Sequence, residues 1–71
     1  MNIRVGMICT AQGKTYPATA LVHANDVNTA RVFAETHAKL NGAESVEFPI
    51  SWKLLPRKWQ LWFLEHGVYS F

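Results

Sequence analysis

Apolar and polar positions alternate over the first ten residues, as in a β-strand with one apolar face. The apolar positions are Ile3, Val5, Met7 and Cys9, and the intervening positions are Arg4, Gly6, Ile8 and Thr10. Residues 11–14 contain Gly13, which suits a turn position that needs a positive φ. Residues 15–23 are therefore expected to return as a second strand. Pro17 has no N–H to donate to a ladder, so it places this strand at an edge of the sheet.

Helical spacing follows, from a cap at Asn25 or Asp26 to a stop at Gly42. One face of this helix carries Val27, Ala30, Phe33, Ala34, His37 and Leu40. Its alanines allow the helix to approach a sheet closely. On a second side, Arg31, Glu35 and Lys39 recur every four residues. This side is expected to be solvated, with the acid able to pair with either base.

Alternation resumes over residues 46–52 and predicts a third strand. Its apolar face carries Val46, Phe48, Ile50 and Trp52. Pro49 makes this strand a second edge, which leaves the first strand in the middle of the sheet. The predicted order is 2-1-3, antiparallel throughout, with the helix crossing one face by a right-handed connection. Val5 and Met7 are expected to be deeply buried. Their predicted neighbours are Phe33 and Phe48.

A short aromatic helix is predicted to begin at Pro56, which suits a first helical position, and to end before Gly67. Its docking face consists of Leu55, Trp59, Trp62, Phe63 and His66. Leu61 and Leu64 lie on the far side, near Arg57. A helix that only covered its own core would be polar there. These two leucines are therefore expected to face outward.

The elements together predict an α+β fold with the order ββαβα, formed by residues 1–71 as one compact domain. A domain of this size buries only about 60% of its unfolded surface, so its core is thin. It has too little mass to bury the last helix on every side. A second copy or another protein is therefore expected to cover the outer leucines.

Positive charge is concentrated near the C-terminus, where the region contains three basic residues and one acidic residue, Lys53, Arg57, Lys58 and Glu65. Their balance equals the formal net charge of the whole chain, +2. A charge this mild does not demand a nucleic-acid partner. The single Cys9 cannot form an internal disulfide and favours a reducing compartment. No segment approaches the ~20 apolar residues of a membrane span, and no signal peptide is recognisable. The chain is expected to be a complete small cytoplasmic protein without membrane contact.

The residue spacings do not indicate catalysis, a cofactor or a metal site. His23, His37, His66 and Cys9 share no ligand spacing, and no paired carboxylates are present. An enzyme is therefore not expected. His37 is interpreted as a histidine at the core edge, the alternative being a pH-sensitive contact. Cys9 is interpreted as a small buried apolar residue and is expected to be unreactive.

Protein binding is the first functional hypothesis. The chain would act stoichiometrically, as an inhibitor or modulator of a larger host protein, and a homodimer is the nearest variant. The candidate contact residues are Arg57, Leu61, Leu64 and Trp62, because aromatic residues and arginine are the usual anchors of interfaces. In size and composition the chain resembles the very small accessory proteins of phages and mobile elements.

Nucleic-acid binding is the alternative hypothesis. Its candidate residues are Lys53, Arg57, Lys58 and Trp59, which could neutralise phosphates and stack on bases. Basic residues in a first helical turn oppose the helix dipole, which slightly disfavours a purely structural role for them. However, the expected exposed sheet positions offer no aromatic platform for RNA. These positions are Arg4, Gly6, Ile8, Glu47 and Ser51. Protein binding is therefore preferred.

Overall fold

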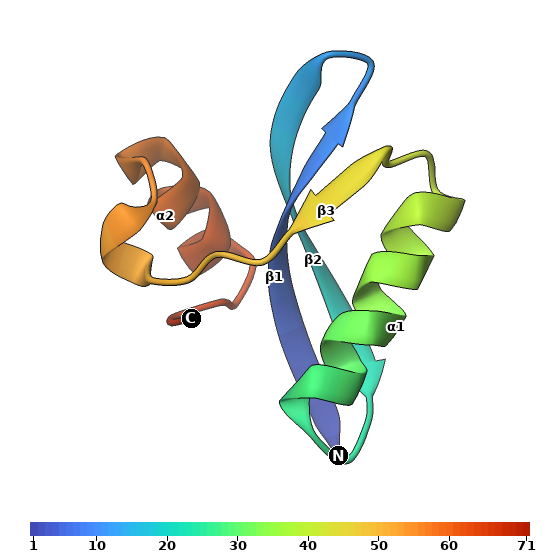
Figure 1. Cartoon of the computed structure of the whole chain (residues 1–71). Coiled ribbons are helices and arrows are strands. Elements are labelled where there is room, and N and C mark those ends of the chain that lie inside the picture. Colours follow the sequence, from blue (N-terminus) through green and yellow to red (C-terminus); the bar gives the residue numbers. More distant parts are fainter.

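The computed structural model describes residues 1–71 and contains a three-stranded sheet, two α-helices and a short 3-10 helix (Figure 1). The elements are β1 (Asn2–Ala11), β2 (Lys14–His23), α1 (Val27–Leu40), β3 (Ser45–Glu47), η1 (Trp52–Leu54) and α2 (Arg57–Glu65). The strands are antiparallel and lie in the order β2-β1-β3. The predicted α+β class, element order and sheet order are confirmed.

A two-residue turn joins β1 and β2. Gln12 and Gly13 have φ values of 53° and 73°, as the tightest hairpin turns require. Ala11 and Lys14 are therefore the first hydrogen-bonded pair, and hydrogen-bonded pairs recur at every second residue along the ladder. Pro17 falls between two such pairs, so its missing N–H would have pointed away from β1. This phase explains why the edge strand accepts a proline.

Helix α1 begins where the sequence predicts but packs differently. The Asp26 carboxylate accepts a hydrogen bond from the Thr29 N–H at 2.8 Å and caps the helix. Ala30 and Ala34 are fully buried against the sheet. Phe33, predicted as core, is 52% exposed. Because the two alanines bring the helix close to the sheet, Phe33 lies on its flank, beside the residues of β2. Val27, His37 and Leu40 of the same predicted face are also exposed.

Strand β3 is shorter than predicted and ends at Glu47. Its pairing with β1 runs from Thr10 opposite Ser45 to Ile8 opposite Glu47. Continued by two residues, this register would place Pro49 opposite Gly6. Pro49 has no N–H for that position, so the chain leaves the sheet. Beyond it, Trp52 starts η1 instead of ending a strand.

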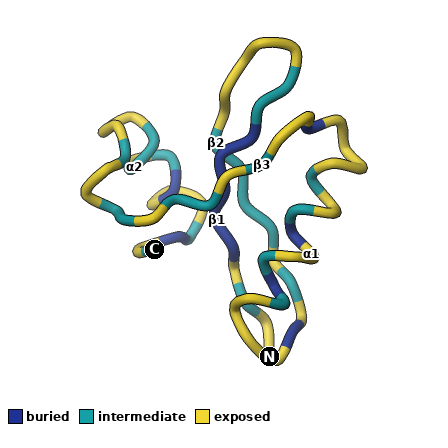
Figure 2. Tube along the Cα trace, in the orientation of Figure 1, coloured by how far each residue is buried: buried dark blue, intermediate teal, exposed yellow.

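Residues 5–9 of the central strand β1 are buried, so both faces of this part of the strand are covered (Figure 2). Val5, Met7 and Cys9 belong to the cluster under α1, which confirms the predicted burial of the first two. Ile8 belongs to a second cluster under α2. Gly6 is buried as well. The prediction that Gly6 and Ile8 lie on an exposed face is therefore wrong, and the sheet lies between the two helices (Figure 1).

Candidate protein-binding surface

Aromatic packing fixes α2 on the sheet. Phe63 is fully buried and forms a cluster with Ile8 and Val68. Partly buried side chains surround this cluster, namely Trp52, Leu55, Trp59, Trp62 and Phe71. The predicted docking face is thus correct except for His66, which is exposed. The His66 ring instead stacks on Trp62, with the ring centroids 3.8 Å apart.

Hydrogen bonds hold both ends of α2. The helix begins at Arg57, one residue later than predicted, so Pro56 is its N-cap instead of its first helical residue. Near the start, the Gln60 side-chain amide donates to the Trp52 carbonyl at 2.8 Å. At the end, the Val68 N–H donates to the Phe63 carbonyl at 2.8 Å. Gly67, the predicted stop, has a φ of +83°. The helix is therefore presented in a fixed orientation.

The outer face of α2 consists of Arg57, Leu61 and Leu64. Leu61 is 50% exposed, Leu64 is 40% exposed, and Arg57 is exposed too. These residues lie where the sequence predicts, facing away from the docked cluster. Trp62, the fourth candidate, lies instead on the docked side, edge-on to Phe63 with ring centroids 5.3 Å apart. The structure therefore brings three of the four candidates together.

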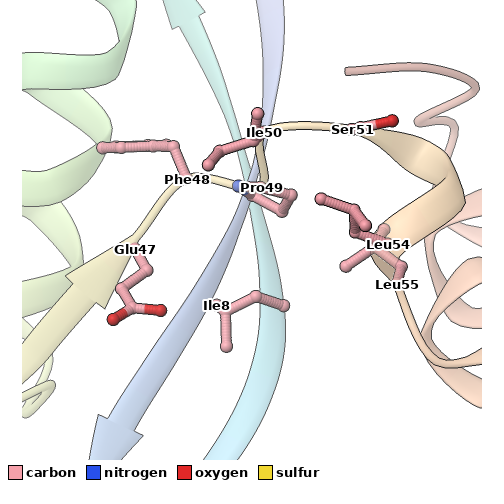
Figure 3. Close-up of a pocket in the computed structure, with 8 residues that line it drawn as sticks. All are labelled: Ile8, Glu47, Phe48, Pro49, Ile50, Ser51, Leu54 and Leu55. Carbon is pink, nitrogen blue, oxygen red and sulfur yellow. The ribbon is translucent and has the colours of Figure 1, made fainter.

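An apolar hollow of about 490 Å³ lies beside the residues that precede α2 (Figure 3). It is lined by Ile8, Glu47, Phe48, Pro49, Ile50, Ser51, Leu54 and Leu55. Ile50 is 89% exposed and Leu54 is 74% exposed. Glu47 and Ser51 are the polar residues of the lining. The hollow can accept an apolar side chain, as the pockets that hold interface anchors do.

The sequence does not reveal this hollow, because the alternation over residues 46–52 predicts that Ile50 lies in a strand. Pro49 was the available signal. If Pro49 is interpreted as the end of the strand, Ile50 falls in a loop without sheet partners.

The three basic candidates Lys53, Arg57 and Lys58 are exposed. The only ion pair of the chain is elsewhere, between Lys39 and Glu35, whose charged groups are 3.5 Å apart.

The tryptophan rings near these cations are engaged within the protein. Trp52 stacks on Phe71 with centroids 5.8 Å apart, and Trp62 stacks on His66. Trp59, the stacking candidate, is partly buried, and the Lys58 ammonium lies 5.9 Å from its ring centroid. The three cations are thus free to contact phosphates, whereas the rings are less accessible for stacking on bases.

Cys9 is 1% exposed, and its burial raises the pKa of the thiol. Its predicted position in the core is confirmed, and its low reactivity stays a prediction. His37 is exposed, so its interpretation as a core-edge residue is wrong. No group of three or more His, Cys, Asp or Glu side chains is placed to hold a metal ion. Neither helix has the length and apolar character that crossing a membrane requires.

Comparison with protein-family models, with curated proteins and with solved structures gives no match to this chain.

Proposed function

We propose that this chain is a small cytoplasmic module that binds another protein stoichiometrically and inhibits or modulates it, in the manner of phage-type accessory proteins. The contact surface consists of the hollow and the outer face of α2. One observation carries this proposal. Four aliphatic side chains are exposed within residues 50–64, namely Ile50, Leu54, Leu61 and Leu64. The same segment docks on the sheet through its aromatic residues, so the protein's own core does not account for these four.

The chemistry of the segment suits an interface. Apolar groups exposed in one region mark a surface that gains free energy when a partner removes them from water. Arg57 adds a planar cation that can bind a carboxylate through two hydrogen bonds. The buried Phe63 fixes α2, so little ordering is required when the surface binds. A folded partner with an apolar projection and an acidic rim matches these features.

The test is the double substitution Leu61→Asp with Leu64→Asp. The variant should keep the circular dichroism and unfolding midpoint of the wild type, because both side chains face outward. It should lose stoichiometric capture of the partner from nuclease-treated host lysate. If the substitution unfolds the protein, the leucines belong to the core and the proposal is wrong.

A matched control changes two exposed apolar residues on the other helix, Val32→Asp with Leu40→Asp. Their side chains are 59% and 82% exposed. This control should retain capture. A second variant, Ile50→Asp with Leu54→Asp, tests the hollow separately. If both test variants capture the partner as well as the control does, the contact surface lies elsewhere.

The alternative, nucleic-acid binding, is favoured by the three exposed cations that lack ion pairs. It requires that binding weaken steeply as salt rises. Capture that disappears after nuclease treatment, together with loss of binding in Lys53→Gln with Lys58→Gln, would favour it over protein binding.

A further inference from the structure

One edge of β1 is unpaired over half of its length. In the ladder set by the hairpin turn, Ile3, Val5 and Met7 direct their N–H and C=O groups toward β2. The alternate residues Arg4 and Gly6 direct theirs to the opposite side. There, β3 pairs only with residues 8–10. Gly6 is buried, and a buried backbone group without a partner costs free energy.

A slot of about 220 Å³ lies along this free edge. Its floor is Ile3, Arg4, Val5 and Gly6. Helix α1 forms one wall through Val27 and Arg31, and the C-terminal tail forms the other through Val68, Ser70 and Phe71. A strand edge between apolar walls suits an added strand, because the edge supplies backbone hydrogen bonds while the walls bury side chains.

The two charged side chains that line the slot, Arg4 and Arg31, are both basic. Arg4 projects on the α2 side of the sheet, where its guanidinium lies beside Gly67. Arg31 belongs to the α1 wall, and its guanidinium lies 5.7 Å from the Phe48 ring centroid. Neither arginine has a carboxylate partner, since the chain's one ion pair joins Lys39 and Glu35. An occupant that carries carboxylates on both faces of its strand complements this arrangement.

We propose that the free edge of β1 binds an acidic, extended peptide segment of a partner protein by strand addition. The segment runs antiparallel to β1, in line with β3, and its backbone pairs with Gly6 and Arg4. This site shares no residue with the hollow or with the outer face of α2, so it stands or fails independently of the function proposed above.

The register defines a probe. In the peptide acetyl-Thr-Glu-Glu-Val-Thr-amide, the first residue lies opposite Gly6 and the third opposite Arg4. The third residue directs its N–H toward β1 and its carboxylate to the face of Arg4. The second residue directs its N–H away from β1 and its carboxylate to the face of Arg31. The two glutamates thus lie on opposite faces of the sheet, and only the N–H of the third residue forms a hydrogen bond with β1.

The experiment titrates this probe into isotope-labelled protein and follows the backbone amides by NMR. The amides of Gly6 and Arg4 should shift and exchange more slowly with solvent. N-methylation of the third residue should weaken binding at least about tenfold, because it removes an N–H that pairs with β1. N-methylation of the second residue is the matched control and should leave binding unchanged.

Charge recognition is tested on both partners. A probe with lysine in place of both glutamates should not bind. Arg31→Gln should weaken binding of the acidic probe about tenfold, as expected for losing a charged contact. Lys14→Gln removes an exposed cation at the hairpin turn, away from the slot, and should have no effect.

Four outcomes would overturn the proposal. The first is that the probe does not bind at millimolar concentration, and the second is that the two N-methylations weaken binding equally. The third is that the probe protects the amides of Thr19 and Leu21, on the free edge of β2, and not those of Gly6 and Arg4. The fourth is that, without probe, the Gly6 amide shifts as the protein concentration changes. The last outcome would assign the slot to a second copy of this chain.

Discussion

Substitution of Gly6 by alanine tests the contact between β1 and the C-terminal segment. A Cβ at this position would lie 2.7 Å from Cε1 of Phe71 and 3.1 Å from Cε1 of Phe63. Alanine is intrinsically better than glycine in a strand interior by about 0.5–1 kcal/mol. Overpacking a core costs about 1–3 kcal/mol, and Phe63 is fully buried and cannot move aside. We therefore expect Gly6→Ala to lower the free energy of unfolding by about 1–2 kcal/mol.

Urea unfolding followed by circular dichroism and tryptophan fluorescence measures this change. Phe71→Ala provides the control, because it removes the nearer ring. In that background Gly6→Ala should cost about 1 kcal/mol less than in the wild type, a coupling typical of residues in contact. If Gly6→Ala stabilises the wild type, or costs the same in both backgrounds, Phe71 does not pack over Gly6 as described.

Three further predictions concern the core and the cap of α1. Phe63→Ala should lower the free energy of unfolding by about 3–5 kcal/mol, because the ring is fully buried. Phe33→Ala should lower it by less than about 1 kcal/mol, because that ring is half exposed. Urea titrations of the two variants measure both changes. Cys9 should react with a thiol reagent only as fast as the protein unfolds, and rapid labelling of native protein would contradict its burial. Hydrogen bonds from Thr29 lower the pKa of the Asp26 carboxyl, so its stabilising effect should be lost as pH falls below about 4. Asp26→Asn retains a cap acceptor without titrating, so thermal unfolding of this variant should depend less on acid pH than that of the wild type.

Local features of the fold were readable from the sequence because they depend on neighbouring residues. The turn at Gly13, a helix cap at Asn25 or Asp26 and the edge position of Pro17 each follow from one residue's hydrogen bonding or backbone freedom. The outward direction of Leu61 and Leu64 follows from helical geometry alone. These are the parts of the candidate surface that could be predicted.

The remaining parts depend on contacts between distant segments. Phe33 shares a helical face with Ala30, and only the closeness of the helix to the sheet decides that the alanine is buried and the phenylalanine is not. Gly6 and Ile8 occupy positions that resemble a solvent face, because nothing near them in sequence indicates that Phe63 covers them. The hollow was missed for the same reason, since it forms only when the chain after Pro49 turns back toward the sheet.

The burial of β1 between two separate clusters determines the order in which the molecule should open. Helices α1 and α2 lie on opposite faces of the sheet, so each can detach without disturbing the other directly (Figure 1). The α2 layer joins the sheet through one group of aromatic rings around Phe63. The amides of α2 should therefore exchange with solvent at a lower free energy of opening than those of β1. The β1 amides stay protected as long as either helix remains on the sheet. A molecule in this half-open state would expose Ile8 to solvent and aggregate more readily than either the native or the fully unfolded chain.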